Sequence, residues 1–447
     1  MEVNLKNKMV ADFRSYVSPD KVDFFQKYGL DFVLGKREGC YLWDIDGHKK
    51  LFNAHCNGGV FNLGHRSSDI ISVLKQALDR WDIGNHHLLS AQRAKLAKRL
   101  ADSFPGDIQY TVFGVGGGEA MDLAIKLARG YTGRSKIVSA KGGYHGHTGL
   151  ALAAGDEKYR KSFGPQPPGF VQIPFGDLRL LEEALDEDTA AVIYETIPAT
   201  QGILIPPDGF FSDVRQLCDK KGVQLIIDEV QTGLGRTGKL WGFEHFSGGS
   251  NGDMVPDIVV IGKGLSGGIY PITATCFRPH LQKVFNDDPF IHISTFGGAE
   301  LGCAVALKVL ELSSQAEFLQ HVNDLAKLFR ERMDNLVERH NHFIIAFRQL
   351  GLMMGIKMKN DMCGPLLMKT AYDKDLLLVY AGNDTSVCQF LPPLVMTFEQ
   401  VDEVMEKLEA AVKKATILLP ALQVKEGVSS AWDKVKKLLS GEEKHGG

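Results

Sequence analysis

Three stretches of the sequence place reactive or ligand-binding groups just after short apolar runs. Asp228 and Glu229 end the run QLIIDE, Lys263 follows DIVVIG, and three glycines, Gly116 to Gly118, come soon after QYTVFG. A lysine that is withdrawn from water has a lowered pKa, which makes its amine nucleophilic. Glycines at the start of a helix let backbone N–H groups approach a phosphate. Together the three stretches predict amine chemistry on a ligand that carries an anionic group.

The central part of the chain alternates between short apolar runs and amphipathic helical patterns. The runs that predict strands are QYTVFG, KIVSA, AAVIYE, VQLIIDE, DIVVIG and ITATCF. Strands that recur among helices at this spacing indicate βαβ units and a mostly parallel sheet. Ligands of such sheets collect beyond the carboxyl ends of the strands, which is where all three stretches lie.

The two ends of the chain have different patterns. Residues 41–53, YLWDIDGHKKLFN, predict a β-hairpin that turns at Asp46-Gly47, and residues 397–415 predict a helix with a Thr397/Gln400 capping box. We therefore predict an α/β fold whose large, ligand-binding domain spans residues 71–322. Residues 1–70 and 323–447 combine in a smaller α+β domain, and the final SGEEKHGG is expected to be a solvated tail.

The composition is that of a globular protein and excludes several classes of function. The 447 residues are 44% apolar and 23% charged, and a net charge of −3 gives no reason to expect nucleic acid or an anionic membrane as a partner. No stretch is apolar for long enough to span a membrane, and the first residues lack the apolar core of a signal peptide. The seven scattered cysteines include no C-x-x-C pair, so we expect neither a disulfide framework nor a metal site. The expected location is the cytoplasm.

Two nucleotide-binding motifs are excluded. LIIDE is also typical of a Walker B strand, but the chain has no Gly-Lys-Ser or Gly-Lys-Thr for the P-loop that accompanies it. A dinucleotide fingerprint after QYTVFG would need a glycine where Glu119 stands. A phosphate site, an acid and a desolvated lysine at one sheet edge instead suit pyridoxal phosphate. This cofactor needs an anion site, a carboxylate for its ring nitrogen and an amine for its aldehyde.

The sequence resembles the class III aminotransferases, a family of pyridoxal-phosphate enzymes with the fold of aspartate aminotransferase. The resemblance covers residues 30–415 and is carried by LIIDEVQTGLGRTGKLWGFEHF, DIVVIGKGLSGGIYPI and STFGGAELGCAVAL. It implies a seven-stranded sheet, an obligate homodimer, and transfer of an amino group from an amine donor to a keto acid with ping-pong kinetics.

The resemblance also implies roles for individual residues. Lys263 matches the lysine that binds the cofactor aldehyde and then moves a proton, and Asp228 matches the acid that keeps the pyridine nitrogen protonated. Glu229 is expected to serve the structure around Asp228. The other cofactor contacts that the resemblance implies are Gly116, Gly117 and Gly118 at the phosphate, Tyr144 and Val230 on the two ring faces, Gln231 near the ring hydroxyl, and Thr295, which reaches the phosphate of the partner subunit.

Three places depart from the family pattern. The glycines from Gly116 to Gly118 replace a motif with hydroxyl side chains, so backbone N–H groups are expected to bind the phosphate. Thr200 and Gln389 stand where amino-acid-specific relatives carry a glutamate and an arginine that grips the substrate carboxylate. The expected donor is therefore an ω- or β-amino acid, a diamine or a simple amine. Further candidates for the substrate pocket are Arg348, as the cation for the keto acid, and His86, His87 and His147.

Two alternatives stay open on the sequence alone. Racemases and aminomutases of the same family use the same cofactor without a net exchange of an amino group. A non-catalytic cofactor-binding protein would share the fold, although the intact set of Lys263, Asp228 and Tyr144 argues against it. Product analysis with and without a keto acid separates a transaminase from a racemase.

Overall fold

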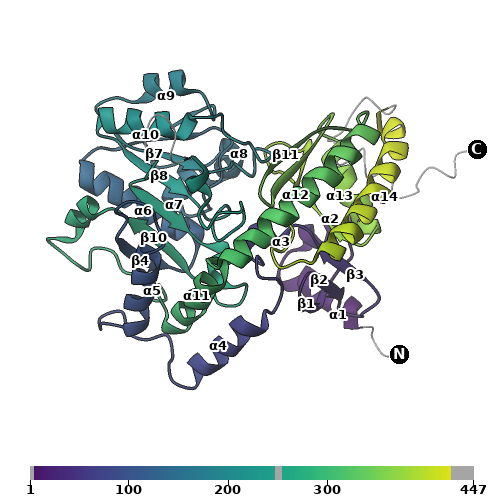
Figure 1. The fold of residues 1–447 in the computed structure, drawn as a ribbon, viewed down its shortest axis with the longest axis horizontal. Helices are drawn as coiled ribbons and strands as arrows, with labels where there is room; N and C mark the ends of the chain where they lie inside the picture. Colours follow the sequence, from purple (N-terminus) through teal and green to yellow (C-terminus); the bar gives the residue numbers. More distant parts are fainter. Residues whose placement is uncertain (1–4, 247–253, 424–447) are drawn as a thin grey trace, which may run out of the picture.

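The computed structural model describes residues 5–246 and 254–423, which form two lobes of unequal size (Figure 1). The larger lobe is built on a seven-stranded sheet and the smaller lobe on two four-stranded sheets. This arrangement confirms the predicted α/β fold class. The polar tail expected at residues 440–447 lies outside the described residues. Within the two described ranges, no helix is both long enough and apolar enough to cross a membrane.

The sheet of the large lobe has the strand order β4-β10-β9-β8-β7-β5-β6. β10 is antiparallel to β4 and β9, and the other neighbouring strands are parallel. All six predicted strands are present, but the sequence pattern does not single out β6, because its run FVQI contains a polar glutamine and is only partly buried. The strands are β4 (Tyr110–Gly114), β5 (Lys136–Ala140), β6 (Phe170–Ile173), β7 (Thr189–Glu195), β8 (Gln224–Asp228), β9 (Ile258–Ile261) and β10 (Thr273–Phe277).

Helices cover both faces of this sheet. On β8, Ile226 belongs to the core that includes α6, whereas Leu225 and Ile227 belong to the core that includes α10. Burying a side chain of this size contributes roughly 1.5–3 kcal/mol. Packing on both faces therefore fixes the position of β8 and of Asp228 at its end. The helices of this lobe are α4 (Ser68–Leu78), α5 (Ala91–Ala101), α6 (Gly117–Thr132), α7 (Gly149–Ala154), α8 (Glu157–Arg160), α9 (Leu178–Ala184), α10 (Phe210–Lys221) and α11 (Glu300–Ser313).

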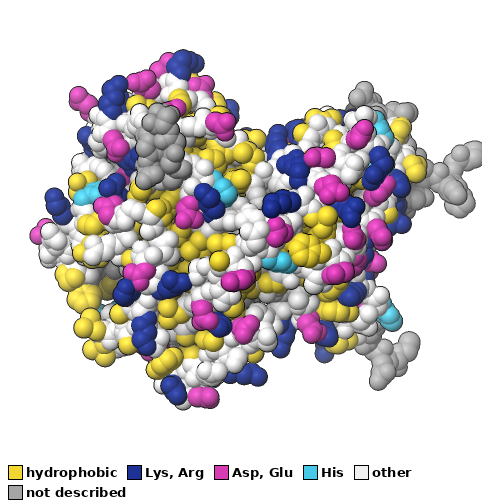
Figure 2. Space-filling view, in the orientation of Figure 1, with side chains coloured by type: hydrophobic (Ala, Val, Ile, Leu, Met, Phe, Trp, Pro, Cys, Tyr) yellow, Lys and Arg dark blue, Asp and Glu magenta, His cyan; other side chains and the backbone are white. Residues whose placement is uncertain are grey.

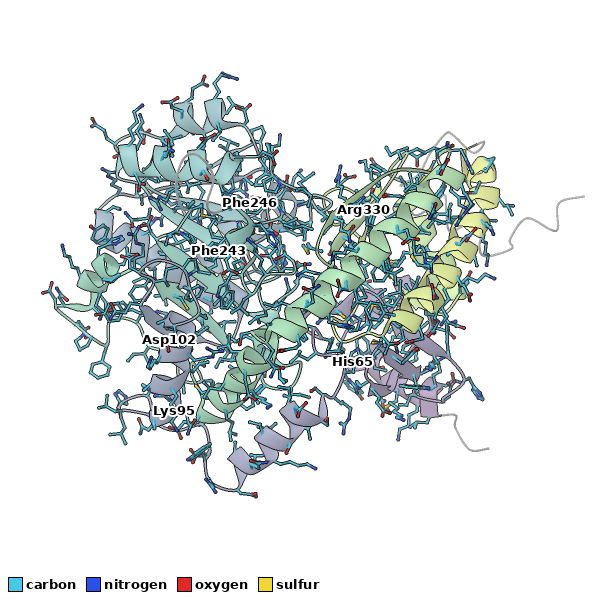
Figure 3. All side chains as sticks on the ribbon, viewed as in Figure 1. His65, Lys95, Asp102, Phe243, Phe246 and Arg330 are labelled. Carbon is cyan, nitrogen blue, oxygen red and sulfur yellow. The ribbon has the colours of Figure 1, made fainter. Side chains whose placement is uncertain are left out.

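The smaller lobe contains segments from both halves of the chain. Strand β13 (Leu376–Leu377) pairs in parallel with β3 (Lys50–Asn53), and α12 (Ala316–Arg339) runs from the large lobe into the small one (Figure 1). On α12, the Arg330 guanidinium lies 4.6 Å from the centre of the Phe347 ring (Figure 3). The predicted division between residues 322 and 323 falls inside this helix.

The small lobe also contains helices and strands from both ends of the chain. They are α1 (Leu5–Tyr16), α2 (Pro19–Lys27), β1 (Leu34–Glu38), β2 (Tyr41–Asp44), α3 (Cys56–Gly59), β11 (Ile344–Leu350), β12 (Met353–Met358), α13 (Cys363–Asp373), β14 (Val379–Tyr380), β15 (Val387–Phe390) and α14 (Phe398–Gln423).

Two local predictions in this lobe can be compared with the structure. The Thr397/Gln400 capping box is confirmed, since Thr397 N donates to Gln400 Oε1 at 2.9 Å and Gln400 N donates to Thr397 Oγ1 at 3.3 Å. The hairpin is also present, with Gly47 in the left-handed conformation at a φ of 77°. Its connection is wider than a two-residue turn, because residues 45–49 separate β2 from β3. All seven cysteines are buried free thiols.

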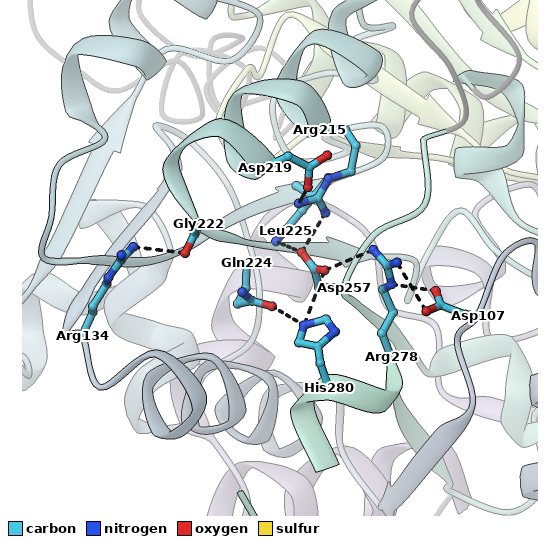
Figure 4. Close-up of polar contacts among 10 residues, drawn as sticks. All are labelled: Asp107, Arg134, Arg215, Asp219, Gly222, Gln224, Leu225, Asp257, Arg278 and His280. Atoms are coloured by element: carbon cyan, nitrogen blue, oxygen red, sulfur yellow. Dashed lines mark hydrogen bonds and ion pairs between the residues drawn. The ribbon is translucent and has the colours of Figure 1, made fainter. Parts of the chain in front are cut away.

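A partly buried network of ion pairs holds the amino-terminal ends of the central strands, at the sheet edge opposite Asp228 and Lys263 (Figure 4). Asp257, which precedes β9, accepts hydrogen bonds from Arg215 Nη1 and from Leu225 N, both at 2.7 Å. Arg278 lies between Asp257 and Asp107, with its Nε 2.6 Å from the Asp107 carboxylate. Buried charges need such partners because an unpaired one is strongly destabilising. The network therefore fixes the amino-terminal ends of β8 and β9. These two strands lead to Asp228 and Lys263.

Candidate active site

The carboxyl ends of the central strands open into a cavity of about 540 Å³ that also touches the first turn of α6. The sequence predicts that the side chains after these strands lie close together, and in the structure many of them line this cavity. Predicted residues that line this cavity are Gly117, Gly118, Tyr144, His147, Thr200, Asp228, Val230, Gln231 and Lys263.

Lys263 begins a short 3₁₀ turn, η3 (Lys263–Ser266), just after β9, and has a φ of 41°. This left-handed conformation is unfavourable for an L residue and is concentrated at functional sites. Lys263 Nζ donates a hydrogen bond to Gln231 Oε1 at 3.2 Å. Burial lowers the pKa of the Lys263 amine, while the negative charges of Asp228 and Glu195 oppose this effect. The net lowering increases the neutral fraction of the amine, which is the form that attacks carbonyl carbon.

Asp228 is buried at the end of β8, where its two carboxylate oxygens have different partners. Oδ2 lies 2.9 Å from His145 Nδ1, and Oδ1 accepts from Val230 N at 3.0 Å. Burial disfavours a charged His145, but the hydrogen bond and the charge of Asp228 outweigh burial and raise the His145 pKa. His145 is therefore either positively charged or shares a proton with Asp228, in a site from which water is largely excluded.

Glu195 is a second buried acid at the cavity, at the end of β7. Its carboxylate accepts from Tyr144 N at 3.0 Å and from Ala199 N at 3.3 Å. Burial raises the pKa of Glu195 to about 7, with His145 opposing and Asp228 reinforcing the rise. These contacts hold the backbone that carries Tyr144 and the loop that carries Thr200.

The first turn of α6 carries two of the three predicted glycines at the cavity wall. Gly117 and Gly118 line the cavity, and a Cβ on Gly118 would lie 2.7 Å from Thr148 Oγ1. Glu119 is a capping residue, since its Oε2 accepts from Val115 N at 2.8 Å. Gly116 precedes the helix as its N-cap and is not among the lining residues. The turn thus leaves backbone N–H groups at the positive end of a helix dipole open to an anion.

Gln389 lies behind Gln231 as seen from the cavity. It is 7% exposed on β15, and its Oε1 accepts from Gln231 Nε2 at 3.5 Å. Burial lowers the pKa of His55, which precedes α3, to about 4, and hydrogen bonding to Gln389 opposes this shift. Sequence reasoning missed His55, because nothing in the local sequence distinguishes it from a packed histidine.

The other predicted substrate residues have different positions. Thr200 lines the cavity and donates to Gly142 O at 3.1 Å. His147 lies at the cavity beside Tyr144, with 5.3 Å between ring centres. Arg348 is not a lining residue, since it lies on β11 and its Nη1 donates to Gly202 O at 2.5 Å.

Three predicted residues lie outside the cavity of their own chain, in segments that meet at the surface. Thr295 and His87 are exposed, and the His87 ring lies 5.6 Å from the Phe290 ring. His86 packs against His87 with 4.3 Å between ring centres. Hydrophobic side chains gather along the edge of the large lobe (Figure 2). The exposed apolar side chains of these two segments, which we call the edge patch, are Leu88, Leu89, Phe290, Ile291, Ile293 and Phe296.

Glu229 holds the loop beyond β8. Its carboxylate accepts from Gly242 N and from Phe243 N, each at 2.8 Å, and from the Thr196 hydroxyl. Phe243 lies within the large lobe (Figure 3). Burial raises the pKa of Glu229 to about 7. Glu229 is not among the residues that line the cavity.

Comparisons with known proteins agree with this geometry. The family described as Aminotransferase class-III matches residues 26–412. An uncharacterized aminotransferase of Archaeoglobus fulgidus is 56% identical over 92% of this chain and 95% of its own. The putrescine aminotransferase of Pectobacterium atrosepticum is 31% identical over 93% of this chain and 91% of its own. The crystal structure of the ornithine aminotransferase from Toxoplasma gondii ME49 has a TM-score of 0.84 at 27% identity, covering 93% of this chain and 97% of that one. Because the family match spans nearly the whole chain and the named relatives are aminotransferases, this chain belongs to the class III aminotransferases and is a transaminase.

Proposed function

We propose that this transaminase uses pyridoxal phosphate and takes its amino group from a terminal amine. The observation that carries the donor assignment is the wall of the cavity: none of the described residues that line it is an arginine. A bidentate arginine–carboxylate pair is the strong way to hold a carboxylate. Gln389, which stands at the family's arginine position, already accepts a hydrogen bond from Gln231. The putrescine aminotransferase relative supports this assignment, since putrescine is a diamine without a carboxylate.

The residues at the cavity fit pyridoxal phosphate. Lys263 supplies a desolvated amine, and Asp228 supplies a buried carboxylate on a neighbouring strand. Gly117 and Gly118 offer N–H groups for the phosphate, in a turn where a Cβ on Gly118 would collide with Thr148. Tyr144 and Val230 would enclose the ring, and Gln231 would lie near its hydroxyl group.

The cofactor and the side chains of this protein each supply part of the reaction. When bound, pyridoxal phosphate supplies an aldehyde and an electron-withdrawing ring that carries the amino group from the donor to the keto acid, which gives ping-pong kinetics. Lys263 Nζ would be the base that takes a proton from the donor carbon and moves it to the carbon that carries the cofactor's aldehyde. Asp228, held by His145 and Val230 N, would supply the carboxylate for the ring nitrogen of the cofactor. Glu195 holds the Tyr144 backbone against this space.

We also propose that two chains form a homodimer through the edge patch. Thr295 is exposed and is not a lining residue of its own cavity, which suits a side chain that serves the neighbouring site. The edge patch is an exposed apolar area of the kind that marks protein interfaces. In such a symmetric dimer, Thr295 would reach the partner's phosphate site, and His86 and His87 would lie near the same boundary.

Complementation between two inactive variants tests this arrangement. Lys263→Ala removes the catalytic amine, and Thr295→Asp places a negative charge next to the phosphate. If Thr295 serves the partner's site, a mixed dimer has one intact site, so co-expression is expected to recover about a quarter of the parent activity. Each variant alone is expected to be inactive. Absence of recovery in mixed dimers that sediment as dimers would show that Thr295 acts in its own chain.

The donor assignment predicts the effect of an arginine at position 389. Gln389→Arg would replace a neutral amide with a guanidinium that can hold a carboxylate, and one hydrogen bond to a charged group contributes roughly 1.5–3 kcal/mol. The parent is expected to have higher kcat/KM for diamines and ω-amino acids than for ordinary α-amino acids. The variant is expected to shift this ratio toward α-amino acids by about tenfold or more. Gln349→Arg, on β11, serves as a control that should leave the ratio unchanged. A parent that prefers α-amino acids would contradict the proposal.

A further inference from the structure

The carbonyl of Gly142 accepts hydrogen bonds from side chains of both lobes. Thr200 Oγ1, in the loop after β7, donates to it at 3.1 Å, and Asn383 Nδ2, in the turn between β14 and β15, donates to it at 2.6 Å. Asn383 N also donates to Thr200 O at 2.8 Å, so the two donors are joined to each other. Gly142 is buried, and a buried carbonyl needs such donors. We call Thr200 and Asn383 the Gly142 clamp.

The turn that carries Asn383 is fixed to the small lobe. Ala381 N donates to Val387 O at 2.7 Å, and Val387 N donates to Asp384 O at 3.0 Å, which closes the turn on itself. The Asp384 carboxylate pairs with a lysine of β12, with 2.9 Å between Lys357 Nζ and Asp384 Oδ2. The sheet of the small lobe therefore holds Asn383 while its amide contacts the large lobe.

The Gly142 clamp acts two residues before Tyr144, whose side chain lines the cavity. Tyr144 N donates to Glu195 Oε1 at 3.0 Å, and Gly143 N donates to Ala140 O at 3.0 Å. Gly142 itself has a φ of 81°, in the left-handed region that favours glycine. Since three successive residues are each held, a shift of the Gly142 carbonyl also moves the backbone of Tyr144.

The same turn of the small lobe reaches the ring of Tyr144 through Tyr159. A Cβ on Gly382 would lie 2.6 Å from the Tyr159 hydroxyl oxygen, so a larger residue would push this hydroxyl aside. The Tyr159 ring packs edge-to-face on the Tyr144 ring, with 5.3 Å between ring centres. Lys158 Nζ donates to Gly382 O at 2.5 Å. The small lobe thus contacts the backbone side of Tyr144 through Asn383 and the ring side through Tyr159.

We propose that Asn383 is a positioning residue: through the Gly142 carbonyl it makes the place of the Tyr144 ring in the cavity depend on the position of the small lobe. Asn383 does not line the cavity, so it acts through Gly142 and not by contact with a ligand. The hydroxyl of Thr200 is committed to the same carbonyl. The consequence for cofactor binding rests on the proposed place of Tyr144 against the ring of pyridoxal phosphate.

The first test measures amide hydrogen exchange in cofactor-free full-length protein by mass spectrometry. In Asn383→Ala, Gly142 keeps only the Thr200 donor, and the protection of the Tyr144 amide is expected to fall about tenfold, the size of one lost hydrogen bond. Protection of β15 is expected to stay at the parent value. Parent-like protection of Tyr144, or an equal loss across the small lobe, would overturn the proposal.

Two matched variants separate the hydrogen bond from the shape of the side chain. Asn383 Oδ1 is buried without a partner among the described residues, so the bond to Gly142 O orients this amide. Asn383→Asp keeps the shape but turns an oxygen toward the Gly142 oxygen, and the Tyr144 amide is expected to lose at least as much protection as in the alanine variant. Asn335→Ala, which loses an amide-to-carbonyl bond on the exposed surface of α12, is expected to leave Tyr144 unchanged.

The double variant tests whether both residues of the Gly142 clamp act on one carbonyl. Thr200→Val alone leaves the Asn383 donor and is expected to cause a smaller loss of protection than Asn383→Ala. Together the two substitutions leave a buried carbonyl without either donor, so the loss is expected to exceed the product of the single losses. Losses that only multiply would show independent effects and would overturn the shared role.

The last test uses pyridoxal phosphate itself. If Asn383 positions Tyr144 for the cofactor ring, Asn383→Ala is expected to bind pyridoxal phosphate about tenfold more weakly, measured by titration of the cofactor-free protein, and Asn335→Ala as tightly as the parent. Parent-like affinity in Asn383→Ala would contradict the positioning role. A parent that does not bind pyridoxal phosphate would instead contradict the proposed function, while the exchange measurements would still decide whether the Gly142 clamp holds Tyr144.

Discussion

Replacing Lys263 with alanine is expected to abolish transamination, with kcat reduced by about 10⁴-fold or more. The variant loses both the amine that would bind the cofactor aldehyde and the base that would move the proton, and acid–base catalysis alone contributes roughly 10²–10⁴-fold. The rate of keto-acid-dependent amino transfer measures the loss. Because the pocket around Lys263 is otherwise intact, we expect the variant to fold and to bind pyridoxal phosphate reversibly.

The matched control for this variant lies on the surface of α5. Lys98 is exposed and pairs with the neighbouring Asp102, whose position is labelled in Figure 3, so Lys98→Ala should retain parent activity. A Lys263→Ala protein that keeps more than a few per cent of the parent kcat would refute the catalytic assignment.

Replacing Asp228 with asparagine is expected to give the second-largest loss. Asparagine keeps the shape and one acceptor for Val230 N, but it removes the charge that would hold a proton on the ring nitrogen of pyridoxal phosphate. One pKa unit corresponds to about 1.4 kcal/mol, so a loss of several units lowers kcat by orders of magnitude. The rate of the donor half-reaction, followed by absorbance under single-turnover conditions, gives the size of the effect.

A second readout for this variant does not depend on turnover. Since the hydrogen bond and charge of Asp228 raise the His145 pKa, Asp228→Asn should lower it, and NMR of labelled histidine measures the change. Asp102→Asn, at an exposed carboxylate, is the control. Near-parent turnover in Asp228→Asn, or an unchanged His145 pKa, would contradict the role assigned to this acid.

Much of the fold is predictable because its strands are buried on both faces. Such strands appear in the sequence as unbroken apolar runs, and β8 and β9 end where Asp228 and Lys263 begin the site. The chemistry at these ends can be predicted because the carboxyl ends of parallel strands meet at one edge of the sheet, where ligands bind. β6 is less apparent, since its four residues are only partly buried.

The partners of these residues are not predictable from the local sequence. His145 and Asp228 are 83 residues apart, and only the parallel pairing of strands brings their ends together. His55 and Gln389 come from opposite halves of the chain and meet through a backbone bond between Ala54 and Leu391. Arg348 illustrates the reverse case: its charge suggested a role toward the keto acid, whereas its guanidinium is bonded to Gly202 O outside the cavity wall.

The measurement that tests the central assignment most directly is covalent fixation of the cofactor. Purified protein is treated with borohydride, digested, and searched by mass spectrometry for lysines that carry a reduced pyridoxyl phosphate group. We expect about one modified lysine per chain, Lys263, in the peptide that contains IGKGLSGG. Label on a different lysine, or bound cofactor that borohydride does not fix to any lysine, would contradict it.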